Sequence, residues 1–179
     1  MLLTEAIVLK ILAAGLLARI AWLDFTTQKI SNRDVLLLVC LGLGSLLLLS
    51  LQSRSWWDMG LSAVAGLLLF LALFPFWLLR KIGAGDVKLL AVVPLLIGGS
   101  GLTVFSLLLL VFALATALVV KNPLLLPQSA FRVYVQHLDE RGVVPFGVPI
   151  SAAAICTIAL QIYWSFVLAN SSGILGQLN

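Results

Sequence analysis

Charged residues are scarce in this sequence of 179 residues. Only 10% are Asp, Glu, Lys or Arg, whereas 62% belong to the apolar set AVILMFWYC, and the mean hydropathy is +1.17. Soluble domains contain about 25% charged and about 45–50% apolar residues, so this composition excludes a soluble globular chain. It also excludes disorder, which requires low hydrophobicity and high charge. The composition therefore predicts a small polytopic membrane protein.

Three further features are missing. The two cysteines, Cys40 and Cys156, form no CxxC pair, which excludes a zinc ribbon. The N-terminus lacks the basic region of a cleavable signal peptide, so we expect the first helix to be retained. Of the 11 Lys and Arg residues, all but Lys10 and Arg19 are scattered through short loops rather than gathered in one run. That distribution indicates the lipid bilayer as a partner and no nucleic acid.

Long apolar stretches dominate what remains. They are unbroken rather than alternating in steps of two, which favours helices over strands. The sequence predicts an all-α, single integral membrane domain over residues 1–179 with six transmembrane helices, at approximately Ala6–Leu23, Val35–Leu51, Met59–Leu79, Val87–Gly98, Leu102–Val120 and Gly147–Leu168.

The loop charges predict the orientation of these helices. Cytoplasmic loops carry the excess of Lys and Arg. With the N-terminus outside, Arg54 is the basic residue of the outer loops, whereas the inner loops hold eight: Lys29, Arg33, Arg80, Lys81, Lys88, Lys121, Arg132 and Arg141. We therefore expect six crossings of the cytoplasmic (inner) membrane, with both termini outside.

The loop between the fifth and sixth spans has its own pattern. Within Ser129–Arg141, four apolar residues recur at helical spacing opposite polar ones: Phe131, Tyr134, Val135 and Leu138. Pro127 precedes this segment and Gly142 follows it, as helix start and stop signals do. The pattern predicts a short amphipathic helix on the cytoplasmic surface.

Two acids abut the hydrophobic spans. Asp24 ends the first span and Asp86 opens the fourth, so the topology places both at the cytoplasmic edge of the bilayer. Acids at such depth are costly and are therefore functional candidates. The alternative is that each caps its helix or pairs with a nearby cation, namely Arg19, Lys29 or Lys88. The other inner acids are expected on solvated loop faces: Asp34, Asp139 and Glu140.

Two carboxylates at one depth suggest an aspartic dyad. Such a dyad needs one ionised carboxylate to deprotonate water and one protonated carboxyl to polarise the scissile carbonyl. Asp86 lies at a helix N-terminus, where the dipole favours the anion, and Asp24 lies at a helix C-terminus. We therefore predict Asp86 as the base and Asp24 as the acid.

Supporting roles follow for nearby residues. Gly83 and Gly85 are expected to clear space beside the acid and to let the backbone bend. Lys88 is expected to contact headgroups or to hold the loop. Asn32 is expected to cap the second span, with Ile30 packed beneath it.

Three segments carry a resemblance to a known family. Asp24 is followed six and eight positions later by Ile30 and Asn32, Gly83–Lys88 spells GxGDxK, and Arg141–Gly147 ends in Pro-Phe-Gly. These segments resemble the motifs of type IV prepilin peptidases. Because the chain lacks an insertion with CxxC pairs, it is similar to the short forms associated with Flp (Tad-type) pili.

The resemblance implies a GxGD-type intramembrane aspartic endopeptidase. Family members remove the short basic leader from prepilins and pseudopilins at the cytoplasmic membrane face, typically after a Gly, with no metal or cofactor. The catalytic pair then corresponds to Asp24 and Asp86. Two alternatives stay open: a small proton- or cation-coupled transporter that uses the same acids, and an inactive membrane protein of pilus assembly.

Overall fold

The computed structural model describes residues 2–122 and 145–175. In chain order its elements are α1 (Leu2–Thr27), α2 (Asn32–Ser53), α3 (Trp57–Leu78), α4 (Ala84–Ile97), a 3-10 helix η1 (Gly99–Gly101), α5 (Leu102–Lys121) and α7 (Gly147–Leu175). Strands are absent from the described residues, which confirms the all-helical prediction.

Five segments are long and apolar enough to cross a membrane, namely α1, α2, α3, η1 with α5, and the first 22 residues of α7. The predicted fourth span corresponds to α4, which has only 14 residues. A helix of that length extends about 21 Å, against a hydrocarbon layer of about 30 Å. Six crossings and their orientation stay predictions, and the predicted amphipathic helix at Ser129–Arg141 lies outside the described residues.

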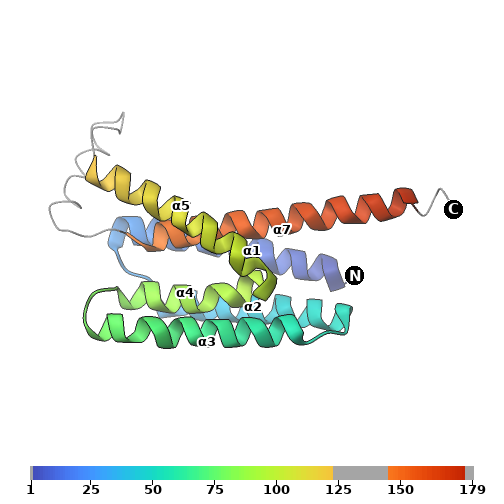
Figure 1. Ribbon diagram of the computed structural model, residues 1–179, viewed down its shortest axis with the longest axis horizontal. Coiled ribbons are helices and arrows are strands. Elements are labelled where there is room, and N and C mark those ends of the chain that lie inside the picture. The colour runs from blue at the N-terminus through green and yellow to red at the C-terminus, as the bar shows by residue number, and fades with distance from the viewer. Residues whose placement is uncertain (1, 123–144, 176–179) are drawn as a thin grey trace.

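The helices lie side by side along the long axis of the molecule (Figure 1). α1 packs against α2 and α7, α4 packs against α2, α3 and α7, and α5 packs against α7. Their shared core consists of large aliphatic side chains from α1, α2, α4 and α7, among them Leu17, Ile20, Leu38, Leu89, Leu96, Ile150 and Ile158.

α3 directs its small residues inward and its large ones outward. Its buried residues are Ser62 and Gly66, whereas Leu67, Leu68 and Leu71 are exposed. A surface helix of a soluble domain does the opposite, burying its apolar stripe. Small residues at the contacts and leucines outside are typical of a helix that faces lipid.

Two glycines bring α4 close to its neighbours. A Cβ at Gly42 of α2 would lie 2.9 Å from the backbone oxygen of Leu95, and a Cβ at Gly66 of α3 would lie 2.6 Å from that of Ala91. A side chain at either position would push the helices apart, so glycine is required for this packing. Because α4 is held closely on both sides, its first turn is fixed relative to α2 and α3.

Candidate active site

The candidate site lies where the C-terminal end of α1 meets the N-terminal ends of α4 and α7, at the left end of the bundle in Figure 1. Asp24 is in the last turn of α1 and Asp86 is in the first turn of α4. α1 is closed by Gln28, which has a left-handed backbone (φ 55°) and whose N–H donates to the Asp24 carbonyl oxygen at 3.0 Å. The fold thus brings both acids to the same end of the bundle.

The Asp24 carboxylate is buried and held by the start of α7. Its Oδ2 accepts a hydrogen bond of 2.8 Å from the N–H of Gly147. Gly147 is the first residue of α7, so this N–H has no partner inside the helix, and a carboxylate is favoured at a helix N-terminus. A Cβ at Gly147 would lie 2.7 Å from both Cγ and Oδ2 of Asp24. The close approach therefore depends on a glycine at this position.

Sequence reasoning missed this contact. It identified Pro145-Phe146-Gly147 as part of a motif but assigned no role to Gly147. The available signal was a glycine at the very start of the last apolar stretch, where the first helical N–H groups are free to bind a side chain.

Asp86 precedes the apolar stretch 87–98 and lies outside the five long apolar segments. Burial, and after it the negative charge of Asp24, raise the pKa of Asp86 to about 6, while a hydrogen bond from the Gly83 backbone acts in the opposite direction. The two carboxylates therefore interact electrostatically, and interacting carboxyls titrate as a coupled pair. With a pKa of about 6, Asp86 is mostly ionised at neutral pH.

Within residues 2–122 and 145–175, neither acid is paired with a cation. Arg19 forms an ion pair with Asp34 instead, and in the described part of the chain no other Lys or Arg nitrogen lies within 4 Å of a carboxylate oxygen. This excludes the alternative in which Asp24 or Asp86 is neutralised by Arg19, Lys29 or Lys88 among these residues.

Gly83 and Gly85 leave room for neighbouring side chains. A Cβ at Gly83 would lie 3.0 Å from Oδ2 of Asp86, and a Cβ at Gly85 would lie 3.0 Å from the Cβ of Ile30. Neither glycine has a left-handed backbone, and the bending expected of them stays a prediction. Ile30 packs directly on Gly85 and thereby joins the α1–α2 loop to the first turn of α4.

A hydrogen bond links the start of α2 to α4. Lys88 Nζ donates to Asn32 Oδ1 at 2.9 Å, so Lys88 holds the loop region, one of its two expected roles. The expectation that Asn32 caps α2 is wrong. The cap is Ser31, whose side-chain oxygen accepts a hydrogen bond of 3.3 Å from the Arg33 N–H. Asn32 is the first helical residue, which leaves its side chain available to Lys88.

Asp34 is not on a solvated loop face as expected. It lies in the first turn of α2, is only 4% exposed, and pairs with Arg19 of α1. Its Oδ2 is buried without a hydrogen-bond partner in the structure. The ion pair fixes the end of α1 that carries Asp24 against α2. The other two acids of that expectation, Asp139 and Glu140, lie outside the described residues.

An apolar groove of about 400 Å³ runs between α1 and α7 beside Asp24 and Gly147. Its walls are alanine, branched aliphatic and aromatic side chains with almost no polar surface: Ala18, Ala21, Trp22, Phe25, Val148, Ala152 and Ile155. In the described residues no three His, Cys, Asp or Glu side chains are grouped so that they could hold a metal ion.

Comparison with known families gives a match that includes both acids. The sequence pattern of the type IV leader peptidase family matches residues 11–120, which is more than half of the chain. The match also covers Ile30, Asn32 and Gly83–Lys88, and it ends before Gly147. No curated protein and no solved structure gives a significant match. The chain therefore belongs to the type IV leader peptidase family.

Proposed function

We propose that this protein is a membrane-embedded aspartic endopeptidase that removes the short basic leader from prepilin- or pseudopilin-like precursors. The observation that carries the proposal is the placement of Asp24 and Asp86 at one end of the bundle, where their carboxylates interact electrostatically and no cation is bound to either in the described part of the chain. Two unpaired acids that interact share protons unequally, which aspartic hydrolysis requires.

We assign the two acids the roles that their places at the helix ends predict; the proton of the coupled pair is shared, because the negative charge of Asp24 also raises the pKa of Asp86. Asp86, mostly ionised at neutral pH, accepts a proton from the attacking water. Asp24 carries a proton on Oδ1 and donates it to the scissile carbonyl oxygen, while its Oδ2 is held by the Gly147 N–H. When the tetrahedral intermediate collapses, the proton on Asp86 passes to the leaving amine, and the intermediate returns a proton to Asp24. Because the pair is coupled, its two pKa values belong to the dyad as a unit.

The groove beside Asp24 suits the hydrophobic segment that follows a leader. Its apolar walls lie on α1 and α7 and include Phe25 and Val148, the chain neighbours of Asp24 and Gly147. A substrate helix packed there would present its N-terminal end to the dyad. We propose that the leader, which is basic, remains on the polar side of this end of the bundle.

The loop charges assign this end to the cytoplasm. Most described cations in loops or at helix ends flank the candidate site, at Lys29, Arg33, Arg80, Lys81, Lys88 and Lys121, whereas Arg54 follows α2 at the opposite end. The positive-inside rule then places the dyad at the cytoplasmic face of the inner membrane, with the N-terminus outside. In this proposal residues 87–101 form the fourth of six crossings, and Asp86 precedes them.

A cleavage assay tests the proposal. Purified protein in liposomes is mixed with prepilin precursors from its own genome, and the products are identified by mass. We expect cleavage by the wild type, none by Asp24→Asn or Asp86→Asn, and wild-type cleavage by Glu5→Gln, an exposed acid at the other end of α1. Cleavage that survives loss of either aspartate would refute the dyad. If the folded wild-type protein cleaves no precursor, the transporter and pilus-assembly hypotheses would be favoured instead.

A further inference from the structure

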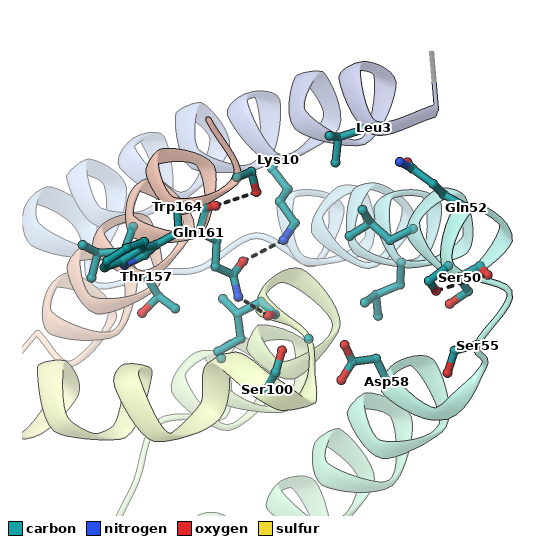
Figure 2. A pocket seen from close by; sticks show the side chains of 18 of the residues that line it. Leu3, Lys10, Ser50, Gln52, Ser55, Asp58, Ser100, Thr157, Gln161 and Trp164 are labelled. Carbon is teal, nitrogen blue, oxygen red and sulfur yellow. Dashed lines mark hydrogen bonds between the residues drawn. The ribbon is translucent and has the colours of Figure 1, made fainter. Parts of the chain in front are cut away.

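A second site lies at the end of the bundle opposite the dyad. There the start of α1, the end of α2, the start of α3 and the later part of α7 surround a cavity of about 930 Å³, and residues 97–101 form part of its wall (Figure 2). Ligand sites typically have volumes of about 300–1,000 Å³, so this one is large enough for a headgroup-sized molecule. The proposed function uses none of its residues.

A buried cation faces this cavity. Lys10 is only 8% exposed, and its Nζ donates to Gln161 Oε1 at 2.7 Å. Gln161 is itself oriented, because its Nε2 donates to the backbone oxygen of Ile97 at 2.5 Å. An ammonium group has three N–H donors, so two remain for a ligand or for water. A buried charge with one neutral acceptor is unfavourable, and an anionic group in the cavity would stabilise it.

An acid lines the same cavity from another helix. Asp58, in the first turn of α3, enters the space from the side opposite Lys10 (Figure 2). The two groups do not form an ion pair, so their charged atoms are more than 4 Å apart. A purely anionic ligand would be repelled by Asp58, and a purely cationic one by Lys10. The separated charges match a zwitterion.

The remaining surface of the cavity is that of a membrane interface. Leu46, Leu49 and Leu160 give it apolar walls. Trp57 and Trp164, which also line it, are 77% and 57% exposed. Exposed tryptophans are enriched at the level of lipid headgroups, where one part of the ring is apolar and another is wet.

We propose that this cavity binds a phosphoethanolamine group, a phosphate ester joined to a primary amine, carried on a phospholipid. The phosphate oxygens accept hydrogen bonds from Lys10, and the primary ammonium donates to Asp58. The acyl chains lie along the apolar wall. Among phospholipid headgroups, phosphocholine has a similar charge but no N–H donor, and phosphoglycerol has no cation, so both fit Asp58 less well.

Native mass spectrometry of the full-length, delipidated protein tests this assignment. The probes are phosphatidylethanolamine, phosphatidylcholine, phosphatidylglycerol and free O-phosphoethanolamine. We expect the wild type to retain phosphatidylethanolamine most tightly. Lys10→Met should weaken its binding about tenfold, as for a lost hydrogen bond to a charged group, and Lys10→Arg should retain most of it. Asp58→Asn should abolish the preference for the primary amine.

Matched controls use exposed charges at the same end of the bundle. Arg54→Gln and Glu5→Gln remove one cation and one anion that do not line the cavity, and both should bind as the wild type does. Because binding is read directly, the outcome does not depend on peptidase activity. If Lys10→Met fails to fold, the test rests on Asp58→Asn, a change at an exposed position.

Each outcome bears on the proposal. Equal binding of the three phospholipids by the wild type would overturn it, as would unchanged selectivity in Asp58→Asn or unchanged affinity in folded Lys10→Met. Tight binding of free O-phosphoethanolamine would support the proposal and would show that the headgroup alone is sufficient for binding. Binding of phosphatidylethanolamine alone would support it with a contribution from the acyl chains.

Discussion

The contact between Gly147 and Asp24 makes a sharp prediction for Gly147→Ala. The added methyl carbon would stand 2.7 Å from Cγ and Oδ2 of Asp24, closer than real Cβ atoms approach such neighbours. Asp24 is buried between α1 and α7, so either its carboxyl must rotate away or the start of α7 must shift. In both cases the 2.8 Å hydrogen bond from the Gly147 N–H is lengthened or lost.

The expected fall in kcat follows from the lost hydrogen bond and from the displacement of the Asp24 carboxyl. A hydrogen bond to a charged group contributes about 1.5–3 kcal/mol, and a shift of about 1 Å in a catalytic group can reduce the rate about 100-fold. We therefore expect kcat for leader removal to fall about 100-fold in Gly147→Ala. If the carboxyl rotates and α7 keeps its place, KM should change little, because the groove walls on α1 and α7 are then unaltered.

The assay is steady-state cleavage of the precursor identified above, with thermal unfolding measured on the same preparations. The matched control is Gly60→Ala, also a glycine in the first turn of a helix, where a Cβ would meet nothing within 4 Å. It should cleave at the wild-type rate. A folded Gly147→Ala protein with wild-type kcat would refute the claim that Gly147 positions Asp24.

Three other predictions concern pH, packing and the buried ion pair. The raised pKa of Asp86, about 6, means that this base is protonated already in mild acid, so kcat/KM should fall as the pH drops through that value; a flat profile in a pH series would contradict the assigned role. Gly85→Ala should lower kcat about tenfold through contact with Ile30, and Ile30→Ala in the same chain should restore part of the cleavage rate if packing is the cause. Arg19→Gln should lower the free energy of unfolding by about 1–2 kcal/mol, because it leaves buried Asp34 without its exposed partner; adding Asp34→Asn should recover part of the lost thermal stability.

The sequence predicted the helices well because most of them begin and end near the limits of the apolar stretches. α5 and α7 begin at Leu102 and Gly147, the residues at which the apolar stretches start. α1 and α2 are longer than predicted, because polar residues at the edges of the apolar stretch continue the helical hydrogen bonding. The segment 87–98 predicted a helix correctly, but helix length alone does not settle whether α4 crosses a membrane.

The candidate site was predictable only in part. The parity of helix crossings places Asp24 and Asp86 at one end of the bundle, which requires no knowledge of packing. The hydrogen bond from Gly147 to Asp24 depends on how α7 packs against α1, and these two residues are far apart in the sequence. The burial of Asp34 depends on how α1 packs against α2, because its partner Arg19 lies on the other helix. Asn32 was misassigned because Ser31, one residue earlier, also has a side chain that caps helices.

At both sites, unpaired backbone groups at a helix end bind a polar side chain. Within a helix the backbone N–H and C=O groups bond to each other, so only those at the helix ends are free to bind side chains in an apolar layer. At one end the first N–H of α7 binds Asp24, and at the other the last carbonyl oxygen of α4, that of Ile97, binds Gln161, which in turn holds Lys10. α4 stops there because Gly98 leaves the helical conformation at φ 74°. The early end of α4 therefore leaves room for the cavity and supplies the acceptor that orients its cation.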